Sequence, residues 1–382
     1  MEVYGEEHSV VRQYADRLAG VDAESVRRAS LREGARIVRL PPYRGVDIDV
    51  LDLSSTGTTG TFKDWVACVA VAECLAQGWQ TVLAQSSGNT ANALARYASN
   101  MGIRCVILYP AASRRRIQPS LAELPEVDFV EVAAPERLIK EALRDYADTS
   151  GIPAVPSISC QYEANKLRAY FLRDAAFELG RGWDWHVQAL SSGYGPFGFY
   201  RGLFEIQRSG TPALQTPRFL GIQQEAVAPY ASAIGGSFGD SSAPMIEPTL
   251  FRKALTPSLI AEMQQVCAAS GGTVRHVPNR RYRELEPPAV RMLAAAGVPI
   301  TLDGSGQPRE RAGLYSLVGA INAIDDDLID PGQQVLAVHT GGSGTAAAGS
   351  FQPSYMAAPH NIAEVISAAL AFRGPLVGSR RP

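Results

Sequence analysis

The sequence has little lysine: only four of its 36 basic residues are lysines, and the remainder are arginines. A search for a catalytic amine therefore has few candidates. Lys140 falls in an amphipathic helical pattern, and Lys166 and Lys253 have similarly charged, helix-like surroundings, which indicates solvent-exposed side chains. Lys63 differs from these three because it follows a loop rich in glycine and threonine.

The sequence also lacks paired cysteines. Its five cysteines, at positions 68, 74, 105, 160 and 267, form no Cys-x-x-Cys pair and no metal-like grouping with the five scattered histidines. They are typical of small core residues in a reducing compartment. We therefore predict no bound metal.

Strong net charge and long apolar runs are missing as well. The formal net charge is -2, which favours neither nucleic acid nor an anionic membrane surface as a partner. No run approaches membrane-spanning length, and residues 1–18 lack the basic region and apolar stretch of a signal peptide. We expect a soluble, cytoplasmic enzyme for small molecules, and 382 residues are enough for two or so packed lobes.

Short apolar runs rich in β-branched residues alternate with helix-length segments. The runs predict strands at 81–85, 105–109, 128–132, 186–190, 219–223 and 335–340. The predicted helices span 64–77, 89–101, 135–148, 162–180, 197–209, 257–270 and 308–324. This order predicts an α/β fold with parallel sheets covered by helices, and with ligands at the carboxyl ends of strands. A Pro-, Ser- and Gly-rich stretch at 149–160 predicts a domain boundary, and 235–244 is typical of an exposed loop.

The loop before Lys63 belongs to the stretch TGTTGTFKDWVA, residues 56–67. A phosphate-binding P-loop is excluded because two residues separate Gly60 from the lysine and an acid follows it. A cation in the first turn of a helix opposes the helix dipole, and the apolar neighbours Phe62 and Trp65 would lower the pKa of the lysine by desolvation. Such a lysine suits Schiff-base chemistry.

Three further turns each follow a predicted strand. SSGNTANALARYA, at 86–98, leaves backbone amides at a helix start, where a carboxylate or phosphate is favoured, with the amide of Asn89 beside them. An ordinary helix cap is the alternative there. SSGYGPFGFYRG, at 191–202, has glycines that let several amides converge on one anion, although a tight strand-to-helix turn has the same pattern. Thr340 ends a strand before GGSGTAAAG, at a place where threonine is more often structural.

In this order the four segments resemble the fold type II family of pyridoxal-phosphate (PLP) enzymes. TGTFKD is similar to the family's lysine motif, SSGNTA to its asparagine loop, SSGYGP to its phosphate loop and HTGGSG to its pyridine-nitrogen segment. The resemblance covers residues 50–350 and is strongest to threonine synthase and cysteate synthase. It implies a two-lobed homodimeric enzyme like the tryptophan synthase β subunit, with PLP in the cleft between the lobes. Residues 1–63 and 161–382 would form the large PLP-binding domain, and 64–160 a small mobile domain.

The resemblance also implies a role for each motif residue. Lys63 would form a Schiff base with the cofactor aldehyde, be displaced by the substrate amine and then move the Cα proton. Asn89 would bind the 3′ oxygen of the cofactor, and Thr340 would meet its pyridine nitrogen. The cofactor phosphate would be bound by Ser191, Ser192, Gly193, Tyr194 and Gly195. The substrate α-carboxylate would be bound by Ser86, Ser87, Gly88 and Thr90.

A threonine at the ring nitrogen has a consequence for the reaction. Its hydroxyl cannot keep a proton on that nitrogen as a carboxylate would, which favours loss of a leaving group from Cβ or Cγ over transamination. The resemblance to cysteate synthase then implies β-replacement on an activated, serine-like amino acid of the O-phosphoserine type by a small nucleophile, through an aminoacrylate intermediate.

Three alternatives remain open. Threonine synthase performs β,γ-replacement on O-phosphohomoserine, but its usual Gly-x-Lys-Thr step is replaced here by Phe171, Leu172, Arg173 and Asp174. A PLP-dependent deaminase or desulfhydrase is the second alternative. A catalytically silent PLP-binding regulator is the third.

Two basic clusters are candidates for binding a substrate phosphate. One is SRRR at 113–116, just past a predicted strand, and the other is Lys166 with Arg168 near the start of the predicted helix 162–180. A second buried phosphate requires cationic or hydroxyl partners of its own. A solvated basic face is the alternative for both clusters.

Overall fold

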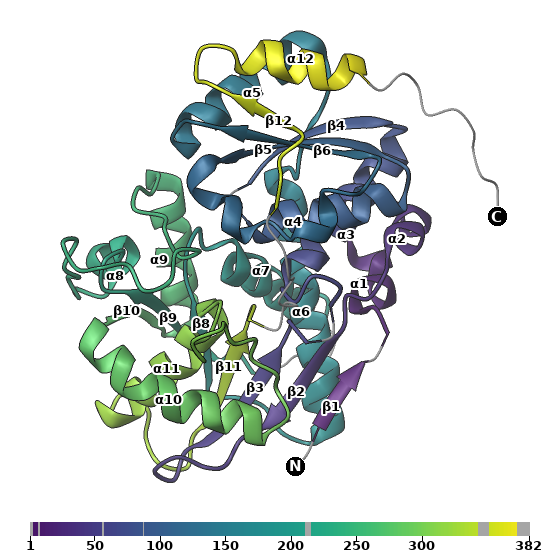
Figure 1. Ribbon diagram of the computed structural model, residues 1–382. Coiled ribbons are helices and arrows are strands. Elements are labelled where there is room, and N and C mark those ends of the chain that lie inside the picture. The colour runs from purple at the N-terminus through teal and green to yellow at the C-terminus, as the bar shows by residue number, and fades with distance from the viewer. Residues whose placement is uncertain are drawn as a thin grey trace. The chain divides into compact units, whose positions relative to one another are not determined.

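The chain divides into two compact units (Figure 1). Unit 1 comprises Met1–Ala19, Ser30–Trp65 and Ile158–Ala346, and unit 2 comprises Gly20–Ala29, Val66–Ser157 and Ala347–Pro382. Within these ranges the computed structural model describes residues 3–6, 8–55, 57–86, 88–210, 215–342 and 351–372. The change from unit 2 to unit 1 after Ser157 falls inside the predicted boundary stretch. Residues 20–29 and 351–372, however, lie in unit 2, whereas the sequence places both in the large domain.

Unit 1 is built on a seven-stranded sheet in the order β1-β2-β3-β11-β8-β9-β10. The strands are β1 (Val3–Glu6), β2 (Ala35–Arg39), β3 (Asp47–Asp52), β8 (Trp185–Ala189), β9 (Arg218–Gln224), β10 (Thr273–Val277) and β11 (Gln334–His339). β2 runs antiparallel to both neighbours, and the strands from β3 to β10 in the sheet are parallel. Parallel strands end at one edge of a sheet, so the segments after Asp52, Ala189 and His339 meet at the edge where ligands bind in such folds.

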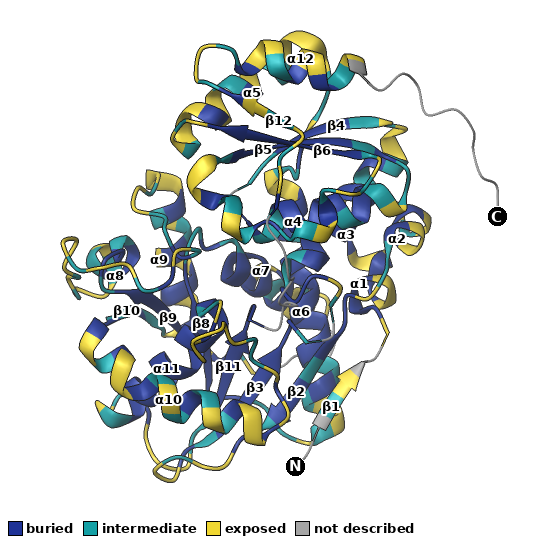
Figure 2. Ribbon diagram, viewed as in Figure 1, coloured by how far each residue is buried: buried dark blue, intermediate teal, exposed yellow. Residues whose placement is uncertain are grey.

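Alternate residues of the central strand β8 face opposite layers of helices. Val187 belongs to the hydrophobic core shared with α10 (Asn279–Ala295) and α11 (Ala312–Asp325). His186 instead contacts Phe199 of α7 (Tyr194–Arg208), with ring centroids 4.5 Å apart. The sheet is therefore covered on both faces, and its strands are mostly buried (Figure 2). The other helices of unit 1 are α1 (Val10–Gln13), α6 (Ile158–Leu179), α8 (Pro229–Ile234), α9 (Pro257–Ser270) and a short 3-10 helix at Ala15–Arg17.

Helices α6 and α7 approach each other closely through glycines of α7. A Cβ atom added to Gly202 would lie 2.5 Å from the carbonyl oxygen of Lys166, and one added to Gly198 would lie 2.7 Å from that of Tyr162. Both distances are far shorter than a van der Waals contact, so no side chain fits at either position. This close approach brings the buried side chain of Arg168, in α6, beside the first turn of α7.

Unit 2 contains a five-stranded, all-parallel sheet in the order β12-β6-β5-β4-β7. The strands are β4 (Thr81–Gln85), β5 (Arg104–Pro110), β6 (Val127–Val132), β7 (Ala154–Val155) and β12 (Tyr355–Ala357). The helices are α2 (Ala23–Ala29), α3 (Lys63–Gln77), α4 (Asn89–Asn100), α5 (Glu136–Ser150) and α12 (Ile362–Phe372), with 3-10 helices at Ala111–Arg116 and Pro119–Leu121. The first three residues of α3, including Lys63, belong to unit 1. One core cluster joins β4, β5 and β6 to α5 and to the C-terminal β12 and α12. The C-terminal segment thus completes this unit.

The predicted α/β fold with parallel sheets is confirmed. The strand 81–85 coincides with β4, and the other five predicted strands match β5, β6, β8, β9 and β11 with ends shifted by one residue. All seven predicted helices are present, but the one predicted at 308–324 begins only at Ala312, because Pro308 pairs with Leu302 ahead of it. The sequence did not predict strands β1, β2, β3, β7, β10 and β12 or helices α1, α2, α8, α10 and α12. α10 contains Pro287 and Pro288, which argue against a helix.

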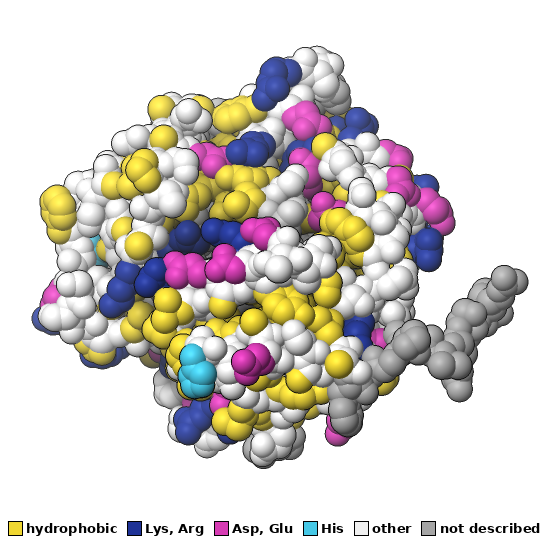
Figure 3. Space-filling model, turned by 90° about the horizontal axis from the view of Figure 1, so that it is seen from above, with side chains coloured by type: hydrophobic (Ala, Val, Ile, Leu, Met, Phe, Trp, Pro, Cys, Tyr) yellow, Lys and Arg dark blue, Asp and Glu magenta, His cyan; other side chains and the backbone are white. Residues whose placement is uncertain are grey.

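Charges of both signs are mixed on the surface. On the face shown in Figure 3, Lys and Arg side chains lie beside Asp and Glu side chains rather than in a patch of one sign. Ion pairs along α5 are of this kind: Lys140 contacts Glu136, and Arg137 contacts Glu141. In the part of the chain that the structure describes, no helix is both long enough and apolar enough to cross a membrane.

The close packing of α6 on α7 predicts the effect of a single methyl group. Gly202→Ala should lower the free energy of unfolding by about 1–3 kcal/mol, because the added carbon would push α6 away through the Lys166 carbonyl. Gly304→Ala is the matched control, since no atom lies within 4 Å of a Cβ at that position. Urea unfolding of both variants checks the expectation, and equal midpoints would contradict it.

Candidate active site

Asp64 closes the loop that precedes Lys63. Its carboxylate accepts hydrogen bonds from the backbone amides of Thr58 at 2.6 Å and Thr59 at 2.9 Å, and from the Thr59 hydroxyl at 2.6 Å. A Cβ atom on Gly57 would overlap the same carboxylate, so only glycine fits there. The loop is wrapped around a buried acid, and Lys63 follows it as the first residue of α3.

Backbone pairing joins this loop to the carboxyl end of β11. Thr61 forms an antiparallel bridge with Gly341, and the Phe62 amide donates to the Thr340 carbonyl at 3.0 Å. The backbone amide of Lys63 donates to Thr61 Oγ1 at 3.3 Å. Two predicted site residues that are far apart in the sequence, Lys63 and Thr340, are therefore brought together within unit 1.

The ammonium of Lys63 lies over an aromatic ring and near a second cation. Its Nζ is 4.3 Å from the ring centroid of Phe62, and the guanidinium carbon of Arg168 is 4.8 Å from the same centroid. Desolvation, followed by the charge of Arg168, lowers the pKa of Lys63 to about 8, while the charge of Glu310 raises it. Part of this amine is therefore neutral and nucleophilic near neutral pH.

In the turn after β8, no side chain caps the first backbone amides of α7. Gly193 caps the helix with a φ of 91°, a conformation that favours glycine. A Cβ atom there would lie 2.7 Å from Phe197 and 2.9 Å from the hydroxyl of Tyr230, which itself donates to the Ser192 carbonyl at 2.9 Å. The first amides of a helix have no partner within the helix, so this turn suits an anion.

The other residues predicted for this turn differ in exposure. Ser191, Ser192 and Tyr194 are partly exposed, whereas Gly193 and Gly195 are buried. A Cβ atom on Gly195 would overlap the side-chain amide of Gln188, so the second buried glycine is also required by packing.

Beside this turn lies a buried arginine. Arg168 is 1% exposed, and its Nη1 donates to Gln188 Oε1 at 3.3 Å. Its Nε and Nη2 atoms are buried and have no hydrogen-bond partner among the described residues. Nη1 lies 3.4 Å from the position of a Cβ on Gly195, and burial lowers the pKa of the guanidinium to about 9. Unused guanidinium donors next to a helix N-terminus fit a phosphate group, either that of the expected cofactor or that of a phosphorylated substrate.

The second residue of that basic cluster, Lys166, is buried and not solvent-exposed as the sequence indicated, because α6 packs closely on α7. Lys166 forms ion pairs with Glu163 at 2.8 Å and with Glu205 at 3.3 Å. Two carboxylates therefore neutralise the lysine charge. Of the two residues, Arg168 is the one with donors that have no hydrogen-bond partner in the described part of the chain.

In unit 2, the loop 86–90 leads from β4 into α4. The hydroxyl of Ser86 accepts from the amide of Ala91 at 3.1 Å and from that of Gly88 at 3.4 Å. Asn89 and Thr90, the first residues of α4, are partly exposed. Ser87 lies outside the described residues. Ser86 thus accepts hydrogen bonds at the start of α4, whose N-cap residue is Gly88.

The SRRR cluster, also in unit 2, separates into three different settings. Arg114 pairs with Glu131, and Arg115 is exposed. Arg116 packs against the loop 86–90, because its Cβ and Cδ each lie 3.4 Å from the position of a Cβ on Gly88. Arg116 is therefore the member of this cluster that lies beside a predicted substrate loop.

Sequence reasoning did not identify three residues of this site: Asp64, Gln188 and Glu310. The side chain of Glu310 lies against Gly341, where a Cβ atom would overlap its carboxylate. Asp64 had a usable signal, since it follows Lys63 directly. Glu310 was not identified because the sequence pattern predicted a helix from residue 308, whereas α11 begins at Ala312.

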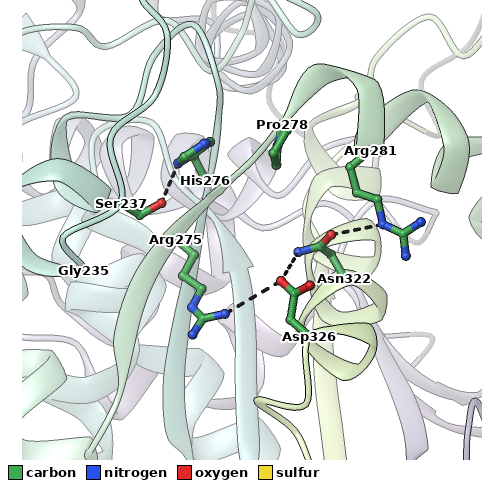
Figure 4. A pocket seen from close by; sticks show the side chains of 8 residues that line it. All are labelled: Gly235, Ser237, Arg275, His276, Pro278, Arg281, Asn322 and Asp326. Atoms are coloured by element: carbon green, nitrogen blue, oxygen red, sulfur yellow. Dashed lines mark hydrogen bonds and ion pairs between the residues drawn. The ribbon is translucent and has the colours of Figure 1, made fainter.

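A hollow of about 520 Å³ in unit 1 contains none of these residues (Figure 4). It lies at the edge strand β10 and is lined by side chains that bind one another. Ser237 and His276 share a hydrogen bond of 2.6 Å, and Arg275 lies 3.9 Å from Asp326. The polar side chains that line the hollow therefore bind one another.

Comparison with known proteins gives consistent matches. A family model described as "Pyridoxal-phosphate dependent enzyme" matches residues 33–341. Threonine synthase of Mycobacterium leprae (strain TN) is 27% identical over 340 residues, which cover 87% of this chain and 87% of that protein. Threonine synthase of Mycobacterium tuberculosis (strain ATCC 25618 / H37Rv) is 26% identical over 295 residues, 76% of this chain and 75% of that one.

Solved structures share the fold at lower identity. The crystal structure of O-ureido-L-serine synthase matches with a TM-score of 0.57 and 18% identity, covering 80% of this chain and 88% of that chain. The processed form of threonine deaminase isoform 2 from Solanum lycopersicum matches with a TM-score of 0.61 and 13% identity, covering 87% and 89%. At such identities the likeness establishes the fold alone.

The buried acid of the lysine loop predicts a pH-dependent stability. Burial raises the pKa of Asp64 to about 6, although hydrogen bonds from Thr59 and Thr58 lower it. The folded protein therefore binds this proton more tightly than the unfolded chain, where the pKa of Asp is about 4. The contribution of Asp64 is largest below pH 4 and is lost as the pH rises through 6.

Asp64→Asn cannot ionise, so its free energy of unfolding should rise relative to wild type between about pH 4 and 6, by up to about 3 kcal/mol. Above that window the difference should stay constant. Urea unfolding from pH 4 to 8 measures it, with Asp148→Asn, at an exposed position of α5, as the control. A difference that does not change with pH would show that the loop does not depend on this ionisation.

Proposed function

Because the chain belongs to the family of pyridoxal-phosphate dependent enzymes, we propose that it catalyses β-replacement on an activated, serine-like amino acid. Its cofactor is PLP and its class is that of a lyase or transferase, both as predicted. The predicted fold type II architecture is confirmed by the solved structures that share it. As an enzyme of this family, it acts on a small amino-acid substrate.

The observation that carries the proposal is the setting of Lys63. Lys63 has a lowered pKa and is the first residue of α3. The preceding residue, Phe62, donates a backbone hydrogen bond to the carbonyl of Thr340. PLP supplies, when bound, an electron sink that weakens the bonds at the substrate Cα. In the proposal, the Lys63 amine attaches the cofactor aldehyde and later accepts the Cα proton at Nζ.

The remaining predicted residues take the roles that the motifs imply. Asn89 is proposed for the 3′ oxygen of the cofactor. The turn after β8 is proposed for the cofactor phosphate through Ser191, Ser192, Gly193, Tyr194 and Gly195. The substrate α-carboxylate is proposed to bind Ser86, Ser87, Gly88 and Thr90.

The proposed reaction type follows from Thr340. This buried hydroxyl would meet the pyridine nitrogen at the carboxyl end of β11. A hydroxyl is neutral, so it leaves the ring a weaker electron sink than a carboxylate partner would. Loss of a group from Cβ then competes well with full delocalisation, which supports replacement or elimination.

Arg168 supports a phosphorylated substrate. Its two unused donors are desolvated, and a buried unpaired cation is costly unless an anion binds it. Arg116, beside Gly88, is the second proposed partner. Lys166 and Arg114 are each occupied by carboxylates and are excluded from this role. An O-phosphoserine-type substrate, as in cysteate synthase, is therefore preferred.

Threonine synthase is the second candidate because relatives of that name cover most of the chain. Residues 171–174, which depart from the threonine synthase pattern, make structural contacts in this chain. Arg173 pairs with Asp174, and the hydroxyl of Tyr14 donates to Asp174 at 2.6 Å. These residues hold the N-terminal segment of unit 1, which supports a reaction other than that on O-phosphohomoserine.

Borohydride reduction tests the role of Lys63. Reduction of the yellow enzyme should fix the cofactor on the peptide that contains Lys63, since the other three lysines lack a comparable setting. Lys63→Ala should lose the label, and Lys253→Ala should retain it. A label on Lys140, Lys166 or Lys253 would refute the assignment and, with it, the proposed function.

Substrate competition tests the leaving group. O-phosphoserine should be processed in preference to O-acetylserine and O-phosphohomoserine. Arg168→Met and Arg116→Met should each raise the KM for the phosphorylated substrate at least tenfold, about 1.4 kcal/mol of lost binding. Arg115→Met, at an exposed position, is the matched control.

Two outcomes of this competition would redirect the proposal. A preference for O-phosphohomoserine would favour threonine synthase. A phosphoserine preference that neither substitution changes would mean that other groups bind the leaving phosphate. The dissociation constant of PLP, measured in the same variants, distinguishes loss of the cofactor phosphate from loss of the substrate phosphate.

A further inference from the structure

Glu310 lies where the loop before Lys63 pairs with the segment that follows β11. A Cβ atom on Gly341 would overlap Oε1 of Glu310 and would lie 3.4 Å from Cγ2 of Thr61. The carbonyl oxygen of Glu310 lies 3.3 Å from the position of a Cβ on Gly342. Both the side chain and the backbone of Glu310 therefore pack against the glycines that follow Thr340.

This position is close to Lys63 through the backbone pairing. Thr61 bridges to Gly341, and the next residue, Phe62, donates to the Thr340 carbonyl. Lys63 follows directly in the chain. The carboxylate of Glu310 thus packs against the backbone that pairs with the loop before Lys63.

Two opposite charges act on Lys63 from two different elements. Arg168 comes from α6, and Glu310 comes from the loop before α11. The neighbouring acid, Asp64, is engaged by Thr58 and Thr59 instead. Without an anion, a desolvated amine beside a guanidinium would resist taking up a proton.

We propose that Glu310 is the counter-charge of Lys63, whose ammonium form it stabilises against Arg168 so that Nζ can take up the substrate Cα proton and return it. This inference rests on the proposed role of Lys63. Glu310 acts through the lysine and makes no bond to the substrate. The glycine at position 341 is required because any larger residue would displace the carboxylate.

The test measures the proton on Lys63 directly. The full-length protein is freed of PLP with hydroxylamine, and acetylation of Lys63 by acetic anhydride is followed as a function of pH by peptide mass spectrometry. Only the neutral amine reacts, so the midpoint of this profile reports the ionisation of Lys63. Glu310→Gln should move the midpoint down by about one pH unit, and Arg168→Met should move it up.

A merely structural role would not produce shifts of opposite sign. Glu284→Gln, which removes a surface carboxylate of α10, should leave the midpoint unchanged. Gly341→Ala and Glu310→Asp withdraw the carboxylate without removing its charge, and both should give smaller downward shifts. These two variants decide the question if Glu310→Gln does not fold.

An unchanged or raised midpoint in Glu310→Gln, with the borohydride label still on Lys63, would overturn the role of Glu310 alone. A label on another lysine would overturn the proposed function instead. Similar shifts in Glu310→Gln and Arg168→Met would mean that both substitutions act by loosening the loop, and would also overturn the inference.

Discussion

The backbone pairing of Thr61 with Gly341 is the constraint on which the site of unit 1 depends. β3 and β11 are parallel neighbours, and the amide of Leu53 donates to the carbonyl of His339 at 3.0 Å where both strands end. The chain after β3 is therefore already beside the end of β11 when it turns toward Lys63. The pairing then joins the loop before Lys63 to the backbone of Thr340 and Gly341, against which the Glu310 side chain packs.

The buried charge of Arg168 is an energetic cost of this arrangement. Lys63 and Arg168 both lie near the ring of Phe62, and two donors of Arg168 are buried without a partner among the described residues. Isolated buried cations are unfavourable by several kcal/mol each unless an anion neutralises them. In the proposed site, a cofactor phosphate at the turn after β8, or a phosphorylated substrate, would remove that cost. Ligand binding would then also stabilise unit 1.

The sequence predicted the parts of the molecule that are determined locally. Strand 81–85 and helix 257–270 are marked by β-branching and by periodicity, and both have the predicted bounds. The glycine turns were also recognised, since glycine is needed wherever backbone approaches backbone or an anion. Glu310 was not recognised because its importance comes from contact with Gly341, and no local pattern signals a partner from another segment. The C-terminal strand and helix of unit 2 were missed for the same reason, since β12 pairs with the distant β6.

In the proposed mechanism, two opposed charges would let one lysine serve two steps. To attach the cofactor aldehyde, the amine must be neutral, and desolvation together with Arg168 favours that form. To move the Cα proton, the same nitrogen must become an ammonium, and Glu310 favours that form. Either charge alone would commit the lysine to one state, whereas the pair keeps the two forms close in free energy. The lysine is therefore suited to alternate between nucleophile and proton carrier without a change in the fold.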